Sequence, residues 1–214
     1  TMIPINVMPD TPTQAFLTAL RQQGFAGEID TSAAQRAVYA TDNSIYERPP
    51  QAIVCPQHVA DLQVLTRLLA QEHFRGVVVT ARGGGTGTNG QSLTEGIVVD
   101  VSRHMNHILN IDVAKRQVRV QAGVVKDQLN RALKPHGLFF APELSTSNRA
   151  TIGGMVNTDA SGQGSCTYGK TRDHVLALKT VLWGGEVLES QALSEQTWRD
   201  DITALSANIQ QRFH

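Results

Sequence analysis

The sequence predicts an α+β fold made of two lobes, and three observations carry this prediction. The first part of the chain has a β–α–β pattern: the buried strand Ala52–Cys55, apolar residues at helical spacing over 58–73, and the apolar, β-branched run 77–80. After Arg103 the pattern changes to short segments of alternating apolar and polar residues, which are typical of hairpins. No internal repeat or low-complexity linker separates the two parts. We therefore expect two lobes that meet near Arg103–His107, with a ligand between them.

The first lobe is expected over about residues 39–103, after an N-terminal helical extension over residues 1–38. Residues Thr13–Gly24 form an amphipathic pattern with Gly24 as the C-cap. Its buried face is expected to consist of Phe16, Leu17 and Leu20. The apolar run Ile97–Val101 predicts a further strand at the end of this lobe.

The second lobe is expected over about residues 104–190 and should contain two hairpins and one helix. Segments 108–112 and 117–122 alternate around a short polar turn. Segments 176–183 and 186–189 flank a Gly-Gly pair, which favours a tight reversal. The helix is predicted over 125–136. A polar helix is expected from residue 194 to the end, within a C-terminal segment 191–214.

The segment Thr80–Gly90 is the most informative part of the chain. It contains five glycines and directly follows an apolar, β-branched run. Glycine lets the backbone adopt positive φ, and it lets a ligand lie directly against amide N–H groups. A nest of such N–H groups is an anion site, most often for phosphate. The competing interpretation is a flexible surface loop, because glycine is a common turn residue.

Two well-known phosphate motifs nearly match this loop. Gly85-x-Gly87-x-x-Gly90 fits the dinucleotide fingerprint, but that fingerprint needs a helix directly after the glycines. Here residues 91–96 intervene and a strand begins at Ile97, so we expect no room for a parallel crossover. The loop also fits a P-loop, except that Gln91 stands where the phosphate-binding Lys is required. We therefore expect a diphosphate cradle built from backbone between two strands.

A second stretch, residues 142–169, is poor in large side chains and rich in glycine and hydroxyl groups. Loops of this length in a compact domain are uncommon unless they are functional. The composition suits close packing against a large flat ligand, with many hydrogen bonds and little charge. The competing interpretation is a helix with a glycine-rich cap on an ordinary surface loop.

Composition excludes several classes of function. The formal net charge is zero and there is no basic tract, which argues against nucleic acid or an anionic membrane as the main partner. No apolar run is long enough to span a bilayer, and the start does not resemble a signal peptide. Cys55 and Cys166 form no disulfide framework or CxxC pattern, and His104 and His107 have no nearby partner for a metal. We therefore expect a cytoplasmic protein without a metal site in this chain.

Three ordered segments resemble the FAD-binding domain of the vanillyl-alcohol oxidase/p-cresol methylhydroxylase flavoproteins: Arg82–Gly87, Ala150–Gly154 and Tyr168–Asp173. Within that superfamily the chain is most similar to the D-2-hydroxy acid dehydrogenases, namely D-lactate dehydrogenase, the glycolate oxidase flavin subunit and D-2-hydroxyglutarate dehydrogenase. The opening Tyr39-x-x-Asp42-Asn43-Ser44-Ile45-Tyr46 resembles members fused to an iron–sulfur domain. The resemblance implies a two-lobed FAD-binding domain of the p-cresol methylhydroxylase type.

The resemblance also implies roles for individual residues. The FAD diphosphate would be held by Arg82, Gly83, Gly84, Gly85, Thr86, Gly87, Asn89 and Gly90. The flavin and ribityl chain would be lined by Pro142, Glu143, Leu144, Ser145, Thr146, Thr151, Ile152, Gly153 and Gly154. Further hydrogen bonds would come from Thr158, Asp159, Ala160, Ser161 and Gly162, and Val175 would pack near the adenine. We expect Gly84→Val and Gly85→Val to abolish FAD binding while the domain still folds.

Some relatives attach FAD covalently through a His just after the glycines, but this chain has Thr86 at that position. No Cys lies in 145–154 either, so the FAD is expected to be non-covalent. The family places the substrate-binding Arg, the metal-binding His residues and the catalytic base in later segments, beyond His214. We therefore expect 191–214 to lead into a cap domain, with room for an iron–sulfur cluster in the later part. This chain alone is expected to be inactive.

The resemblance implies hydride transfer from a small D-2-hydroxy acid, of the lactate, glycolate or 2-hydroxyglutarate class, to FAD and then to an electron acceptor. Two alternatives remain at this point. One is a binding module for a nucleotide diphosphate without redox chemistry. The other is a flavin reductase of the cell-wall-precursor type.

Overall fold

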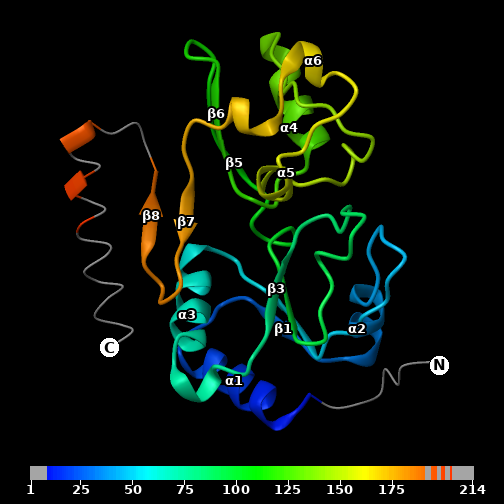
Figure 1. Ribbon diagram of the computed structural model, residues 1–214, viewed down its shortest axis with the longest axis vertical. Coiled ribbons are helices and arrows are strands. Elements are labelled where there is room, and N and C mark those ends of the chain that lie inside the picture. Colours follow the sequence, from blue (N-terminus) through cyan, green and yellow to red (C-terminus); the bar gives the residue numbers. More distant parts are fainter. Residues whose placement is uncertain (1–8, 191–193, 197–198, 201–202, 204–214) are drawn as a thin grey trace.

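The computed structural model describes residues 9–190, 194–196, 199–200 and 203. The described chain forms two lobes stacked along its longest axis (Figure 1). The first lobe consists of α1 (Thr11–Gln22), β1 (Glu28–Asp30), α2 (Ala33–Tyr39), β2 (Ala52–Cys55), α3 (Val59–Leu69), the 3₁₀ helix η1 (Glu72–Phe74), β3 (Val79–Arg82) and β4 (Ile97–Asp100). The remaining elements are β5 (Ile108–Asp112), β6 (Gln117–Val120), α4 (Lys126–Leu133), η2 (Lys134–His136), α5 (Ile152–Thr158), α6 (Ser165–Tyr168), η3 (Thr171–His174), β7 (Lys179–Val181) and β8 (Val187–Glu189).

The sheet of the first lobe has the strand order β1-β2-β4-β3. Strand β4 is parallel to both β2 and β3, so that Ile97 lies opposite Ala52 on one side and Val79 on the other. Strand β1 pairs antiparallel with β2 at the edge. The buried β2 and β4 are apolar along their whole length apart from Asp100, as expected for central strands covered on both faces.

The expectation that β3 and β4 leave no room for a parallel crossover is wrong. The two strands are adjacent and parallel, and the glycine-rich segment 83–96 is itself the crossover. A helix is unnecessary because the connection only has to return alongside a four-residue strand, a distance of roughly 13 Å. The glycine loop therefore leaves the carboxyl end of β3, which is the edge where open α/β sheets bind ligands.

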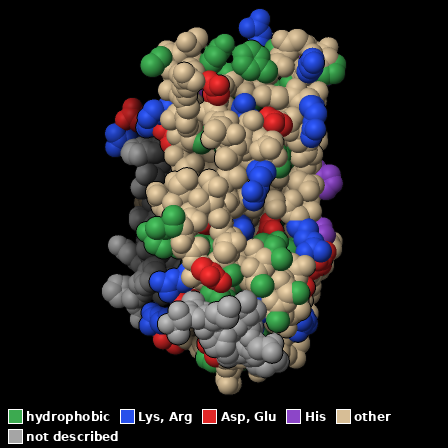
Figure 2. Space-filling model, turned by 90° about the vertical axis from the view of Figure 1, so that its right-hand side faces the viewer, with side chains coloured by type: hydrophobic (Ala, Val, Ile, Leu, Met, Phe, Trp, Pro, Cys, Tyr) green, Lys and Arg blue, Asp and Glu red, His purple; other side chains and the backbone are tan. Residues whose placement is uncertain are grey.

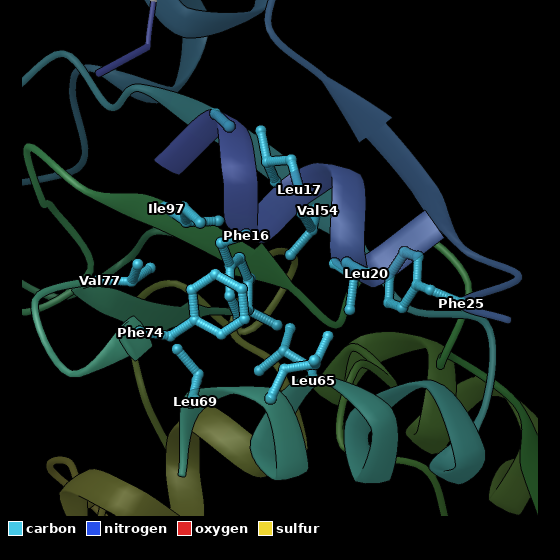
Figure 3. Close-up of a cluster of buried hydrophobic side chains, with 13 residues drawn as sticks. Phe16, Leu17, Leu20, Phe25, Val54, Leu65, Leu69, Phe74, Val77 and Ile97 are labelled. Atoms are coloured by element: carbon cyan, nitrogen blue, oxygen red, sulfur yellow. The ribbon is translucent and has the colours of Figure 1, made fainter. Parts of the chain in front are cut away.

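Apolar side chains from α1, α3 and the sheet form the core of the first lobe (Figure 3). Phe16 and Leu20 are fully buried, and the ring of Phe16 meets that of Phe74 edge to face, with centroids 5.3 Å apart. Helix α1 begins after Asp10, whose carboxylate accepts a hydrogen bond from the N–H of Thr13. Helix α1 and strand β1, which lie within the segment expected as an N-terminal extension, thus contribute to the core and sheet of the first lobe.

The buried carboxylate of Asp61 ties three backbone segments together at the start of α3. It accepts hydrogen bonds from the backbone N–H groups of Ala26, Gln57 and His58. These donors satisfy a charged group that would otherwise be costly to bury. Asp61 thereby fixes the chain between α1 and β1 against the first turn of α3.

Most predicted elements are confirmed, with shifted ends. The helix predicted over 58–73 stops at Leu69 and is followed by η1, and the helix predicted over 125–136 is α4 followed by η2. Both predicted hairpins form antiparallel pairs, β5–β6 and β7–β8. The turn between β7 and β8 packs on α3, where the Gln63 side chain donates to the Gly185 carbonyl at 2.8 Å. The helix predicted from residue 194 lies largely outside the described residues.

Candidate functional site

The two glycine-rich segments predicted from the sequence lie against each other. A Cβ added to Gly83 would lie 2.1 Å from Thr151 Oγ1, and one added to Gly84 would lie 2.0 Å from the carbonyl oxygen of Arg149. The structure therefore brings the loop after β3 together with the chain that leads into α5. At these two positions glycine is required because another segment of the same chain lies where a side chain would be. This corrects the expectation that a Val at position 84 would leave the fold intact.

Two glycines of the loop adopt left-handed backbone conformations. Gly85 is buried and has φ +61°, and Gly90 has φ +71° beside the ring of Tyr46. A left-handed residue between right-handed neighbours turns adjacent N–H groups toward a common concavity, so Gly85 is the position around which an anion nest can form. This geometry is strained for other L-residues, which explains why glycine occupies these two positions.

The amide groups of this loop are available to a ligand. Within residues 9–190, none of the six backbone N–H groups from Gly83 to Thr88 donates a hydrogen bond to a protein acceptor. The next N–H, that of Asn89, donates to Gln91 Oε1 at 3.0 Å. A run of six unused donors fits a ligand with several anionic oxygens. The residues present therefore fit the diphosphate of FAD.

Arg82 directs its hydrogen bonds to the segment 39–41 beside the glycine loop. Its guanidinium donates to the carbonyl oxygens of Thr41, at 2.8 Å, and of Tyr39, at 3.3 Å, and it lies 5.1 Å above the centre of the Tyr39 ring. Burial lowers the pKa of Arg82 below its ordinary value. The Tyr39 hydroxyl donates to the buried carboxylate of Asp100, and burial together with this hydrogen bond raises the pKa of Tyr39.

Segment 41–46 forms a support beside the glycine loop that the sequence did not assign to the site. The backbone N–H of Asn43 donates to the carbonyl of Gly85 at 3.0 Å. Asp42 accepts hydrogen bonds from the Ser92 hydroxyl at 2.9 Å and from the Ser44 N–H at 2.8 Å. Partial burial opposes ionisation of Asp42, but the hydrogen bonds from both serines and the charge of Arg82 lower its pKa overall.

The residues predicted to line the flavin divide into packed and open groups. Thr151 is buried and caps α5 by accepting from the N–H of Gly154. The N–H groups of Ile152 and Gly153 donate to the carbonyls of Val124 and Ala122, both at 2.8 Å. The first turn of α5 is therefore occupied by protein contacts and is not open to an anion.

The open group lies in two neighbouring loops. Gly162 packs on the backbone of Glu143, and the Glu143 carboxylate accepts from the N–H of Gly164 at 2.9 Å. In the described part of the chain, the N–H groups of residues 144–148 and 161–163 have no protein acceptor. The structure brings 142–146 and 160–162 together, and both retain donors for a ligand.

Asp159 and Val175 lie next to other parts of the protein and not among the open amide groups. Asp159 adopts φ +46° and forms an ion pair with Arg172 at 2.5 Å. The N–H of Arg172 also donates to Asp159, and this hydrogen bond is the main reason that the pKa of Asp159 is lowered. Thr171 connects η3 to the same loop by donating to the carbonyl of Ala160. Val175 is half-buried directly after η3.

Two further pockets are lined by residues outside 83–90 and 142–162. One, of about 460 Å³, is lined by residues that include Asp10, Arg48 and Glu95. The other, of about 500 Å³, is lined by Gln57, His58, Arg103, His104, Asn106 and His107. Figure 2 shows the side of the molecule that lies at the right in Figure 1, where backbone and neutral polar side chains dominate and Lys and Arg are scattered. No helix among the described residues is long and apolar enough to cross a membrane.

The sequence is similar to those of several D-2-hydroxyglutarate dehydrogenases and of glycolate oxidase subunits. The chain is 65% identical over 190 residues to a D-2-hydroxyglutarate dehydrogenase of Pseudomonas putida; the match covers 89% of this chain and 19% of the relative. It is 60% identical to the Escherichia coli D-2-hydroxyglutarate dehydrogenase, covering 83% of this chain and 18% of the relative. It is 36% identical to glycolate oxidase subunit GlcD of Bacillus subtilis, covering 83% of this chain and 38% of that subunit. The chain thus spans about a fifth of the length of the dehydrogenases it matches.

Solved structures confirm the α+β fold. An alkyldihydroxyacetonephosphate synthase superposes with a TM-score of 0.75 at 21% identity, covering 91% of this chain and 42% of that one. The 6-hydroxy-D-nicotine oxidase of Arthrobacter nicotinovorans superposes with a TM-score of 0.68 at 23% identity, covering 79% of this chain and 36% of that one. The family model described as an FAD binding domain matches residues 50–191. The chain therefore belongs to the FAD binding domain family.

Proposed function

We propose that this chain is the FAD-binding part of a flavin-dependent dehydrogenase that oxidises a D-2-hydroxy acid, with D-2-hydroxyglutarate as the substrate. The observation that supports FAD binding is the run of six unused amide donors, Gly83–Thr88, in a loop with left-handed Gly85. The support for the substrate is the 65% identity to a D-2-hydroxyglutarate dehydrogenase. That identity gives no support to a non-redox binding module or a cell-wall-precursor reductase.

In this proposal the two glycine-rich regions bind different parts of the cofactor. The amides of residues 83–88 hold the diphosphate, and the open donors of 144–148 and 161–163 hydrogen-bond the ribityl chain and flavin. When bound, FAD supplies the acceptor for the hydride from C2 of the substrate. The residues of this chain bind and orient the cofactor, and Gly83 and Thr151 keep the two loops in contact.

Three further points belong to the same proposal. The flavin is held non-covalently, because Thr86 occupies the linking position. The location is cytoplasmic, which the free thiols Cys55 and Cys166 support, since disulfides are rare in reducing compartments. A separate electron acceptor reoxidises the flavin.

The test uses the full polypeptide that carries this chain. The flavin is released by acid and identified by mass, and the untreated protein is then mixed without oxygen with D-2-hydroxyglutarate, D-lactate or glycolate. We expect FAD, bleached rapidly by D-2-hydroxyglutarate and not by the matched L enantiomer. A protein that contains no FAD refutes the binding proposal. FAD that none of these acids bleaches refutes the dehydrogenase proposal alone.

A further inference from the structure

We propose that Arg149 is a positioning residue of the diphosphate cradle, which orients the Gly84–Gly85 peptide and places an uncompensated positive charge beside it. This inference rests on the proposed function, because it concerns the same ligand, a nucleotide diphosphate. Sequence patterns gave no reason to select Arg149, which directly precedes the predicted Ala150–Gly154 segment.

The first step of the argument is a direct contact. The Arg149 guanidinium donates through Nη2 to the carbonyl oxygen of Gly84 at 3.2 Å. The backbone carbonyl of Arg149 also lies where a Cβ of residue 84 would be, at 2.0 Å. Arg149 therefore contacts the same loop residue through both its backbone and its side chain.

The second step follows from peptide geometry. In a trans peptide the carbonyl and the N–H point in opposite directions. A donor that holds the Gly84 carbonyl therefore aims the N–H of Gly85 to the other side. The Asn43 N–H holds the Gly85 carbonyl at 3.0 Å and in the same way fixes the N–H of Thr86. Two consecutive unused donors are thus oriented before a ligand arrives, which lowers the ordering cost of binding.

The third step concerns charge. Arg82 has the carboxylates of Asp42 and Asp100 nearby, and both favour its charged form. Among the ion pairs within the described residues, none involves Arg149. Arg149 also acts on Arg82 as a like charge. An anion bound by the Gly85 N–H would lie across the peptide from the Arg149 guanidinium, and their attraction would act through space at longer range than a direct contact.

The competing explanation is a purely structural tie, in which Arg149 only holds the two loops together by its hydrogen bond to Gly84. This explanation predicts different effects of substitutions at position 149. A tie requires a donor to the Gly84 carbonyl, whereas the proposed role requires a donor and a positive charge. Arg149→Gln keeps a donor without the charge, Arg149→Lys keeps the charge on a different geometry, and Arg149→Ala removes both. Arg131→Ala is the matched control, because Arg131 is an exposed arginine of α4 with no ion pair among the described residues.

The experiment titrates FAD into the flavin-free full polypeptide at low and high salt and measures the unfolding temperature of each flavin-free variant. We expect Arg149→Ala to weaken FAD binding by about threefold to tenfold, because the variant loses the orientation of one peptide and a charge at longer range, and no direct contact to the ligand. Gln should fall between Ala and wild type. The salt dependence of FAD binding should be reduced in Ala and Gln and kept in Lys and Arg131→Ala.

Three outcomes would overturn the inference. Wild-type FAD affinity and salt dependence in Arg149→Ala would overturn it while leaving the proposed function intact. Affinities that follow unfolding temperature rather than charge at position 149 would show a structural tie only. A wild-type protein that binds no FAD would refute the proposed function, and the inference would fall with it.

Discussion

Replacing Gly84 with Ala tests whether the two glycine-rich loops touch as the structure shows. The added Cβ would lie 2.0 Å from the Arg149 carbonyl oxygen and 2.8 Å from its carbonyl carbon. Ordinary contact begins at 3.4 Å, so one loop must move by about 1.4 Å relative to the other. Both partners are backbone atoms, and a rotamer change cannot relieve the clash.

This displacement should lower both the unfolding temperature and the affinity for FAD. Overpacking a close contact costs about 1–3 kcal/mol. In a domain of this size each kcal/mol lowers the unfolding temperature by about 2–4 °C, so the expected decrease is about 2–12 °C. The movement also breaks the 3.2 Å contact between Arg149 Nη2 and the Gly84 carbonyl, so FAD affinity should fall.

The assay compares unfolding temperature and FAD affinity across three alanine variants of the full polypeptide. Gly76→Ala is the neutral control, because a Cβ there meets nothing within 4 Å. Gly137→Ala isolates backbone strain, because its φ is +67° in open space. If Gly84→Ala unfolds at the same temperature as Gly76→Ala, the contact between the loops is refuted.

Four further predictions concern the two lobes and the flavin. Gly87→Ala should change the unfolding temperature little, because the three atoms nearest to its Cβ belong to the Gln91 side chain, which can move. It should weaken FAD binding in a fluorescence titration, and unchanged affinity would exclude Gly87 from the cradle. Acid precipitation should release all flavin because Thr86 cannot link it, and fluorescence left on the polypeptide would contradict this. Burial, with the charge of Asp100, raises the pKa of Cys55 to about 11, so N-ethylmaleimide at neutral pH should label exposed Cys166 and spare Cys55 by mass spectrometry; equal labelling would contradict the burial. The Cys55 thiol ionises at its ordinary pKa in the unfolded chain and at the raised pKa in the folded chain, and this difference stabilises the folded state at pH values below the ordinary pKa. The stabilisation is lost as the pH rises toward about 11, and Cys55→Ala should not show this loss.

The elements predicted from the sequence were those with strong periodicity. Buried β2 and the amphipathic α1 and α3 have continuous or helical apolar patterns, and the Gly-Gly turn identified the β7–β8 hairpin. The short elements β1, α2, α5 and α6 were missed, because three to seven residues carry too little periodicity to be recognised. Their positions are set by tertiary contacts, such as the pairing of β1 with β2.

The candidate site was predicted in part for a similar reason. Glycine density marked both loops, and the structure brings them together. The role of each glycine was not recoverable, since a glycine next to a ligand and one next to another backbone look the same in a sequence. Gly83 and Gly84 proved to be of the second kind. The contact of Asn43 with Gly85 could not be predicted, because Asn43 donates through its backbone N–H, which every residue except proline carries.

The most direct test of FAD binding at the glycine loop is a crystal structure of the full polypeptide with FAD. The account predicts that the diphosphate oxygens accept hydrogen bonds from backbone N–H groups within residues 83–88, with Gly85 still at positive φ and Arg149 still in contact with Gly84. A diphosphate bound elsewhere, with these N–H groups facing only solvent, would contradict it.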